Sequence, residues 1–562
     1  MPAELPLHLE EVDYASTGFD GQIARFRPTA PEIAARTWVY QPYDLLTTET
    51  GPLAELGAER GGLLMVECPA KVKPRPYHKK KLALLLSSER HFALEAAARG
   101  YKVLYIRNYD SFGDGLLDAQ RDWNAGEITV MQPAERELRK DLERAVKRGL
   151  KLKIVQDTTW LSTEDDFNEV FKASSDRKLR HFLMDRFYRC MRKNTGRLME
   201  NEKPVGDRYS FDAENRQTYK GQVRVPERPS YQPDAITQEV LALVERVCPR
   251  NFGSLAGFDW PCSEREVRHF WTFTLARLLP QFGPYEDAMS TRERDLFHSK
   301  ISGLMNLSRL LPQRVVRDVA KANAAGNISL ASAEGFIRQI LGWREFMRHI
   351  HRITDGFRNL DVFYEKGKPH NAGATPSALH ATLPLPAAYW GSKSGLHCLD
   401  TVVEQVIEEG WSHHITRLMV LSNLATLCGF SPRELCDWFW FAYVDAYDWV
   451  VESNVLGLST YADGGVTATK PYVSGAAYIH RMSDYCGQCQ YDPKKALGEG
   501  SCPFTSLYWT FLERNQEQLG ENPRLAMPYR TLARKTARER QQLRARAQQA
   551  IDALQAVPRS EY

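Results

Sequence analysis

Hydrophobic and polar positions follow different patterns in the two halves of this chain. Between residues 37 and 158, short apolar runs at 63–68, 101–106, 127–131 and 150–155 alternate with amphipathic segments at 81–99 and 135–148. The runs have the length of buried strands, and the amphipathic segments have helical spacing, the first one ending at Gly100. Alternating strands and helices predict a parallel α/β domain. No G-x-G-x-x-G sequence follows the first run, so a dinucleotide fingerprint is not predicted.

Helical spacing dominates the second half of the chain. Segments with this spacing lie at 237–247, 264–279, 333–349, 399–410 and 413–428. A stretch rich in Pro, Gly, Asn and Arg at 201–233 separates the two halves and is typical of a surface linker. The pattern therefore predicts an α/β domain with a parallel, Rossmann-like sheet, followed by a large all-α domain.

Segment boundaries follow from these patterns. We expect an N-terminal extension at 1–36, the α/β domain at 37–180, a helix and long linker at 181–236, the all-helical domain at 237–527, and a basic C-terminal helix at 528–562. The extension carries several prolines and has no clear periodicity. The last helix, expected at 531–554, is basic at its start, and the simplest interpretation of that charge is a solvated face.

Composition narrows the class of protein. A chain of 562 residues with 43% hydrophobic residues can bury a large core in two or three domains. Ten cysteines in so long a chain do not make a disulfide scaffold, and no secretion signal or membrane-spanning run is evident, so we expect a cytoplasmic protein with reduced thiols. The net charge is only +4, so any contact with nucleic acid requires a local basic patch.

Four cysteines are spaced like metal ligands. Cys486 and Cys489 form a Cys-x2-Cys pair, Cys502 follows after twelve intervening residues, and Cys398 lies upstream. Four thiolates suit either a structural zinc ion or an iron–sulfur cluster. A Cys-x2-Cys pair can also occur without function, so the surrounding residues determine whether it indicates a metal site.

The order of domains, with a cysteine group closing the helical one, resembles the photolyase/cryptochrome family. The most similar branch is the iron–sulfur bacterial branch, the prokaryotic (6-4) photolyases. The resemblance spans about 63–529 and is carried by the segments 78–81, 204–216, 335–345, 461–472 and 482–486. It implies blue-light-driven repair of (6-4) pyrimidine–pyrimidone photoproducts in DNA, by electron transfer from excited reduced FAD. It also implies a 4Fe–4S cluster on Cys398, Cys486, Cys489 and Cys502.

The resemblance implies that FAD binds in the helical domain. The residues matched to the family's flavin site are Tyr285, His298, Ser299, Ser302, Gln339, Arg344, Arg417, Asp448 and Asn454. In this match Ser299 and Ser302 donate hydroxyls to the diphosphate, Arg417 lies beside the isoalloxazine, and Asn454 faces its N5 atom. Without the resemblance, the two serines are ordinary turn residues and Asp448 is an acid on a helix surface.

Two adjacent histidines are the predicted catalytic residues. If the segment after Trp411 is helical, His414, Arg417 and Leu418 share one face, and His413 points about 100° away around the helix. The family's (6-4) enzymes use a histidine there as the proton donor to the lesion, and histidine can change protonation near neutral pH. The alternative is a hydrogen-bonded core histidine.

Electron relay and lesion binding are also implied by the resemblance. Trp390 and Trp438 match the tryptophans that relay electrons to the oxidised flavin. Phe439 follows, where relatives have tyrosine, and a phenylalanine cannot readily serve as a hopping station. Lys470 and Tyr472 are candidates for the rim of the lesion pocket, or alternatively a loop charge and a core aromatic.

The α/β domain of this branch binds an antenna, 6,7-dimethyl-8-ribityllumazine. Asp44 and Glu67 occupy the matching positions, whereas Lys71 stands where relatives can have an acid. UV-damaged DNA is the expected partner of a monomer without membrane contact, associated with the nucleoid when bound. Two alternatives stay open: a cryptochrome-like blue-light photoreceptor with the same cofactors, and a nucleic-acid enzyme without light chemistry, similar to the iron–sulfur domain of primases.

Overall fold

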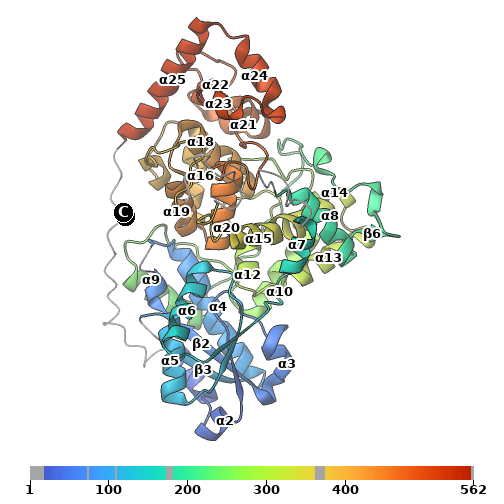
Figure 1. Ribbon diagram of the computed structural model, residues 1–562, viewed down its shortest axis with the longest axis vertical. Coiled ribbons are helices and arrows are strands. Elements are labelled where there is room, and N and C mark those ends of the chain that lie inside the picture. Colours follow the sequence, from blue (N-terminus) through green and yellow to red (C-terminus); the bar gives the residue numbers. More distant parts are fainter. Residues whose placement is uncertain (1–17, 73–74, 108–109, 172–181, 361–373, 558–562) are drawn as a thin grey trace.

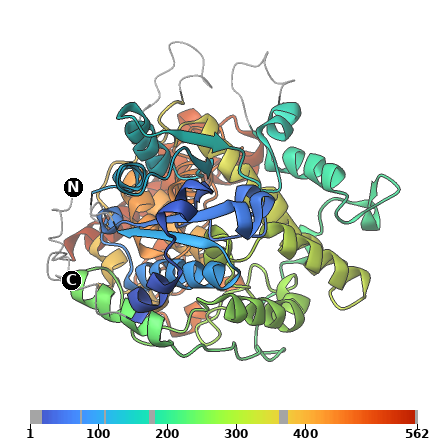
Figure 2. The same ribbon diagram turned by 90° about the horizontal axis from the view of Figure 1, so that it is seen from below.

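The computed structural model describes residues 18–72, 75–107, 110–171, 182–360 and 374–557. Residues 1–17 of the predicted extension therefore lie outside the described residues. An α/β domain forms one end of the molecule and helices of the second half fill the rest, with the last helices at the opposite end (Figure 1). Figure 2 views the same molecule from the α/β end. Buried apolar side chains of both domains form one continuous core.

Five parallel strands form the sheet, in the order β3-β2-β1-β4-β5. The strands are β1 Thr37–Tyr40, β2 Gly61–Glu67, β3 Lys102–Arg107, β4 Ile128–Met131 and β5 Leu152–Val155. The parallel sheet predicted from the apolar runs is confirmed. Strand β1 was not predicted, because four residues are too few to establish a pattern. It is nevertheless central, and the strand order reverses beside it, which is where open α/β sheets bind ligands.

Helices cover the sheet on both faces. They are α3 Gly51–Arg60, α4 Lys79–Ala98, α5 Phe112–Trp123 and α6 Arg136–Lys147. Because parallel crossovers are right-handed, the reversal at β1 places α3 and α4 on one face and α5 and α6 on the other. Helix α4 is buried over most of its length, including Lys79, Lys80 and Lys81, because it also packs against α9 Ala235–Val247 of the second domain.

The described part of the predicted extension is folded. It contains α1 Gly18–Ile23 and α2 Ala30–Ala34. The Phe19 ring is fully buried and makes an edge contact with Tyr105 of β3. Glu239 of α9 accepts hydrogen bonds from the backbone N–H groups of Gly18 and Phe19. The chain therefore closes one edge of the sheet before its first strand.

The segment between the domains is more ordered than a linker. It includes α7 Glu164–Phe171, α8 Met184–Thr195 and a short hairpin of β6 Met199–Glu200 and β7 Lys203–Pro204. Beyond the hairpin, Phe211 is buried, and the buried Asn215 donates from Nδ2 to the Ala331 carbonyl (3.2 Å). The predicted surface linker is therefore anchored onto the helical domain.

Four π-helical segments interrupt the described part of the helical domain. They are η7 Thr274–Leu278, η8 Arg338–Arg344, η11 Arg417–Ser422 and η12 Ser453–Ser459. The α-helices are α10 Glu264–Phe273, α11 Leu279–Phe282, α12 Ser302–Asn306, α13 Pro312–Ala324, α14 Leu330–Ile337, α15 Glu345–Ile353, α16 His397–Glu409, α17 His414–Thr416, α18 Asn423–Cys428, α19 Pro432–Ala442, α20 Asp448–Glu452, α21 Ala476–Met482, α22 Pro503–Arg514 and α23 Gln516–Leu519. Several helices predicted as uninterrupted thus contain a wider turn, a feature frequent at functional sites.

The predicted C-terminal helix is divided in two. Helix α24 spans Ala526–Ala533 and helix α25 spans Ala537–Ala556. A new helix begins because Thr536 and Glu539 form a capping box. One face of α25, including Leu543, Ala547 and Ile551, is buried, and the helix packs against α22, so only its other face is solvated. None of the helices within the described ranges has the length and apolar composition needed to cross a membrane.

Candidate active site

An ion pair brings together two residues that were predicted to bind the flavin, Arg417 and Ser302. Arg417, the first residue of η11, donates from Nη1 to Asp445 Oδ1 (3.0 Å) and from Nη2 to Asp445 Oδ2 (2.9 Å). Ser302, at the end of the predicted phosphate-binding turn, donates its hydroxyl to Asp445 Oδ2 (2.6 Å). Asp445 was not predicted from the sequence. It lies three residues before Asp448, the acid that was matched to the family's aspartate.

Aromatic rings surround this ion pair. The Arg417 guanidinium lies 4.1 Å from the Tyr443 ring centre, and Arg417 Nε donates to the Ser412 carbonyl (2.7 Å). The indole N–H of Trp411 reaches the Ser302 hydroxyl at 3.4 Å. The guanidinium is thus held on three sides, and its position is fixed without help from a ligand.

Three histidines meet beside this cluster. The rings of His298 and His413 are parallel, with centres 4.3 Å apart and an interplanar angle of 7°. The His414 ring lies 5.3 Å from His298 in an edge arrangement. His413 is not inside the helix: it is the N-cap of α17, with φ −75° and ψ 165°. Its side chain therefore does not point away from His414 as helical spacing predicted, and both rings contact His298.

The three histidines differ in exposure to solvent. The side chain of His414 is 44% exposed and its Nε2 lies 3.9 Å from Asp287 Oδ1. His413 is buried, and burial together with the neighbouring His414 lowers its pKa to about 3. Burial and the two other histidines also hold the pKa of His298 well below its usual range. At neutral pH the two buried rings are therefore uncharged.

Buried nitrogen atoms here lack partners. Within the described part of the chain, His298 Nε2 and both ring nitrogens of His413 make no hydrogen bond. Such groups are rare in folded proteins, where buried polar atoms are nearly always satisfied. Their position beside Arg417 fits a pocket that receives a polar ligand.

A bacterial protein aligns with nearly the whole chain. The (6-4) photolyase of Agrobacterium fabrum is 38% identical over 510 residues, which cover 90% of this chain and 97% of that protein. The chain belongs to the photolyase/cryptochrome family. Two family models agree with this assignment: the deoxyribodipyrimidine photo-lyase-related protein matches residues 41–260, and the FAD binding domain of DNA photolyase matches residues 336–495.

Solved structures support the fold of this family member. A bacterial class III photolyase from Agrobacterium tumefaciens aligns with a TM-score of 0.55 at 13% identity, covering 93% of this chain and 98% of that one. A Synechocystis cryptochrome aligns with a TM-score of 0.54 at 15% identity, covering 91% and 98%. The predicted arrangement of an α/β domain followed by an all-α, FAD-binding domain is therefore confirmed.

An aromatic series leads outward from the ion pair of this photolyase-family chain. The Trp438 ring centre lies 5.9 Å from Tyr443 and 5.3 Å from Tyr389, and its indole N–H donates to the Tyr389 carbonyl (2.8 Å). Trp390 comes next in sequence, half-buried, with its ring 6.5 Å from Phe441. Predicted relay residues are thus ordered from the buried Trp438 toward the surface.

The four predicted cysteines line one cavity. Cys398 lies in the first turn of α16, Cys486 in the 3-10 turn Tyr485–Gln488, and Cys502 at the N-cap of α22. Cys489 completes the set, and apolar or aromatic side chains fill the remaining lining. Burial raises the pKa of Cys486 to about 11 and of Cys502 to about 12, so a metal must displace protons from these thiols.

The cysteine sulfurs are spaced more widely than the four ligands of a single zinc ion. Among the described residues, His298, His413 and His414 are the one group of three or more potential ligands whose donor atoms all lie within 4.8 Å. No three of the cysteine sulfurs therefore meet that limit. Tetrahedral Zn–S bonds of about 2.3 Å would bring the sulfurs to about 3.8 Å from each other.

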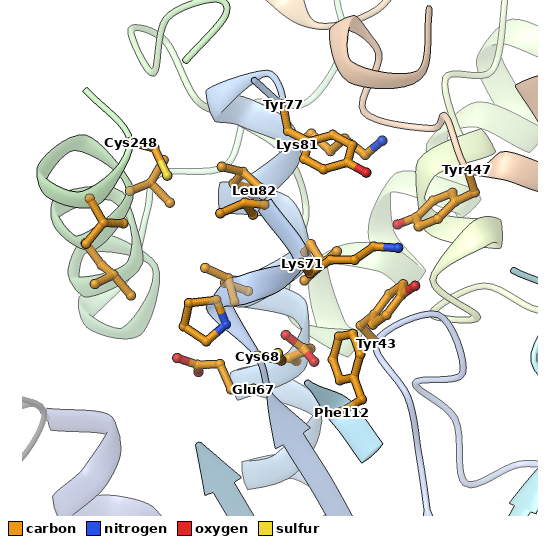
Figure 3. Close-up of a pocket in the computed structure, with 18 of the residues that line it drawn as sticks. Tyr43, Glu67, Cys68, Lys71, Tyr77, Lys81, Leu82, Phe112, Cys248 and Tyr447 are labelled. Atoms are coloured by element: carbon orange, nitrogen blue, oxygen red, sulfur yellow. The ribbon is translucent and has the colours of Figure 1, made fainter. Parts of the chain in front are cut away.

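A second cavity lies between the two domains (Figure 3). Tyr43 follows β1, Glu67 ends β2, and Tyr447 comes from the helical domain, so the cavity opens at the carboxyl ends of the strands. The Tyr43 and Tyr447 rings are nearly parallel, with centres 6.3 Å apart. Lys71 lines the same cavity and donates to Glu135 Oε2 (2.7 Å).

The two predicted antenna acids have different surroundings. Glu67 lines the cavity, and although burial opposes ionisation, the charges of Arg90 and Arg107 lower its pKa to about 2. Asp44 is buried outside the cavity lining. Burial and the nearby Asp157 raise the pKa of Asp44 to about 7. Lys71 was noted in the sequence only as a departure from the family, yet it supplies the cavity with a cation.

Two residues that were predicted to bind the flavin, Asp448 and Arg344, lie at the interface between the domains and not beside Arg417. Asp448 accepts a hydrogen bond from the Glu137 backbone N–H (3.1 Å) and lies 4.0 Å from His351. The Arg344 guanidinium stacks 3.9 Å from the Trp160 ring centre. The structure does not bring either residue to Arg417, because each is bound by groups of the α/β half.

Other predicted residues lie in separate contacts. Gln339 donates from Nε2 to Glu286 Oε1 (2.6 Å). The next residue in sequence, Asp287, is the one that faces His414. Tyr285 stacks on Phe297 with ring centres 5.4 Å apart. Asn454 donates to the Val450 carbonyl within its own helix (2.8 Å), and Ser299 is half-buried in the turn after His298.

The predicted lesion-pocket residues share one neighbour. Burial and the charge of Arg524 lower the pKa of Lys470, and burial raises the pKa of Tyr472, which Arg524 partly offsets. Arg524 itself donates from Nη1 to Thr469 Oγ1 (2.7 Å). Sequence reasoning missed this arginine, since an isolated Arg beside a proline gives no signal.

Proposed function

We propose that this chain repairs (6-4) photoproducts in DNA with blue light. The observation that carries the proposal is the exposed His414 beside two buried, uncharged histidines and the Arg417–Asp445 pair. The chain's 38% identity to a protein named (6-4) photolyase supports the same lesion class. We expect it to act as a monomer on damaged DNA in the cytoplasm.

FAD is the cofactor that these residues fit. When bound and reduced, it supplies the light-excited electron that opens the lesion. The Arg417 guanidinium, which has N–H groups beyond those bound to Asp445 and Ser412, is the donor available to it, and Asp445 holds both Arg417 and Ser302 in place. The unpartnered nitrogens of His298 and His413 add polar groups that such a ligand can satisfy.

His414 is the proposed proton donor to the lesion. Its exposure lets a base flipped out of the duplex reach the ring, and flipping costs least for a damaged base. Its Nε2 lies 3.9 Å from Asp287 Oδ1, whereas the buried His298 and His413 are uncharged at neutral pH and cannot readily supply a proton. Lys470, Tyr472 and Arg524 would contact the DNA beside it.

One repair assay tests this function. The purified protein, reduced and illuminated with blue light, is given oligonucleotides that carry either a (6-4) photoproduct or a cyclobutane dimer, with dark samples as controls. We expect light-dependent loss of the (6-4) product alone. Repair of neither lesion by a flavin-loaded protein would reject the proposal in favour of the photoreceptor.

We also propose that the four cysteines hold a 4Fe–4S cluster. Their common cavity and their sulfur spacing support a cluster over a single zinc ion. Iron and sulfide analysis should give about four of each per chain. Cys489→Ala should lose the iron and lower the unfolding temperature, whereas Cys436→Ala, a buried cysteine outside the cavity, should keep the iron. Stoichiometric zinc without iron would contradict the assignment.

The cavity between the domains is the proposed antenna site. Parallel tyrosine rings, an apolar lining and the Lys71 cation suit a flat heterocycle with polar edges, as the lumazine has. Chromophore released by denaturation should show 6,7-dimethyl-8-ribityllumazine by mass spectrometry. Tyr43→Ala should remove it without removing FAD, and release of FAD alone from the wild-type protein would reject the antenna.

A further inference from the structure

The C-terminal helix contacts the cysteine site through one side chain. Arg546 of α25 donates from Nη2 to the Ser501 carbonyl (3.0 Å) and from Nε to the Ser501 hydroxyl (3.4 Å). Its guanidinium also lies 5.5 Å from the Tyr491 ring centre. Figure 1 shows α25 beside α22, the helix that Cys502 caps.

Both contacted residues belong to the wall of that site. Ser501 is fully buried and immediately precedes Cys502, and Tyr491 lines the cysteine cavity two residues after Cys489. The two strands of this loop are tied together, because Asp492 N–H donates to Gly500 and Cys502 N–H donates to Asp492. Arg546 thus fastens the loop from outside, at the point where its two strands meet.

The guanidinium is itself held in a fixed position. Gln549, one turn later on α25, accepts from Arg546 Nη1 (3.1 Å). Leu543 before Arg546 and Ile551 and Leu554 after it are buried, and Gln555 donates to the Pro384 carbonyl (2.7 Å). The helix that carries Arg546 is therefore anchored on both sides of that residue, so its charge stays beside the cysteine loop.

We propose that Arg546 is a positioning residue of the cysteine site that keeps α25 closed over the loop and raises the reduction potential of the metal centre. This inference rests on the proposed 4Fe–4S cluster. Four thiolates give such a cluster a net negative charge that increases on reduction, so a fixed cation nearby stabilises the reduced form more than the oxidised form. A closed α25 also limits entry of water and oxygen.

Arg544 provides a matched control. It lies two residues earlier on the same helix, is half exposed, and pairs with Glu513 at 2.9 Å. Arg544→Gln and Arg546→Gln therefore remove the same charge from the same helix, but only the second change reaches the cysteine loop. Arg546→Lys keeps the charge and loses the two-point contact with Ser501.

The test uses the full-length, cluster-loaded protein. Midpoint potentials are measured by EPR-monitored redox titration, and cluster loss by the decay of visible absorbance in air. We expect Arg546→Gln to titrate at a more negative potential and to lose its cluster several-fold faster than wild type and Arg544→Gln. Arg546→Lys should keep the wild-type potential but lose its cluster faster than the wild type.

Two outcomes distinguish a failure of the cluster assignment from a failure of the proposed role of Arg546. Iron-free wild-type protein would remove the cluster assignment on which this inference rests. If the wild-type protein holds its cluster, an Arg546→Gln potential equal to that of Arg544→Gln overturns the inference, whatever the stability of the variant. If Arg546→Gln does not fold, the same comparison is made with Arg546→Met, whose aliphatic chain can keep the packing on Tyr491.

Discussion

Arg417 and Asp445 form a two-point ion pair in which the carboxylate is 5% exposed and also accepts the Ser302 hydroxyl. The pair joins the start of η11 to the loop before α20, and Ser302 adds a third segment that is distant in sequence. Removing one partner of a buried pair leaves an uncompensated charge, which makes this relationship the most informative one to test.

Asp445→Asn should therefore release FAD and lower stability. The loss of one partner from a buried pair costs about 3–5 kcal/mol, and the partial exposure of Arg417 places this site at the lower end. The ratio of flavin to protein absorbance and the unfolding midpoint measure the two effects. Asp448→Asn is the control, because Asp448 contacts Glu137 and not Arg417. Equal flavin loss in both variants would contradict this assignment.

Sequence reasoning selected Asp448 and did not find Asp445, because nothing in the sequence relates Asp445 to Arg417. Apolar runs identified β2 to β5, of which β2 and β4 are buried along their whole length and β5, at the edge of the sheet, is partly exposed. Cysteine spacing identified four residues that line one cavity. Helical spacing failed at His413, which is an N-cap residue. The π-helical turns left no sequence signal, because they alter backbone hydrogen bonding without altering the apolar pattern.

Contacts between domains were equally hidden. Tyr43 and Tyr447, or Trp160 and Arg344, meet through packing of elements that are more than 180 residues apart. A single sequence contains no periodicity that relates such positions. The interdomain cavity and the true surroundings of Arg344 could therefore be found only from the folded chain.

His414→Ala should remove most (6-4) repair while leaving the fold intact. Loss of a proton donor typically slows a reaction by about 10²–10⁴-fold. The ring is 44% exposed, so its removal should scarcely change the unfolding temperature. Repair rates under blue light, flavin content and DNA affinity are the measurements. A wild-type repair rate in this variant would reject the proton-donor role.

His413→Ala should behave in the opposite way. This ring is 1% exposed and stacked on His298, so its removal leaves a cavity in the core. We expect a lower unfolding temperature and weaker flavin retention, with repair per bound flavin reduced less than in His414→Ala. A variant as stable as wild type would show that the stacked pair contributes little to packing.

Trp438→Phe should lose most photoreduction of oxidised FAD and keep the flavin bound. Trp438 is the ring between Tyr443, beside Arg417, and Tyr389, which precedes Trp390. Phenylalanine keeps an apolar aromatic ring at this position, although it is smaller and lacks the indole N–H, and it is not readily oxidised. Trp440→Phe is the control on the same helix, since Trp440 stacks on Arg75 at the interdomain cavity. Flavin absorbance during illumination with a reductant should separate the two variants.

Asp44→Asn should stabilise the protein at alkaline pH. Burial and Asp157 raise the pKa of Asp44 to about 7 from an unfolded value near 3.8, so the folded state holds a proton that the unfolded state releases. Its contribution to stability is fully present below about pH 4 and is lost as pH rises through 7. One pKa unit corresponds to about 1.4 kcal/mol, so replacing the titratable carboxyl should raise the free energy of unfolding by at most about 4 kcal/mol at pH 8 and by nothing near pH 4. Unfolding free energies of wild type and variant across this range measure the difference. The exposed Asp165→Asn should show no such pH-dependent gain, and a constant difference for Asp44→Asn across the range would refute the role of its proton.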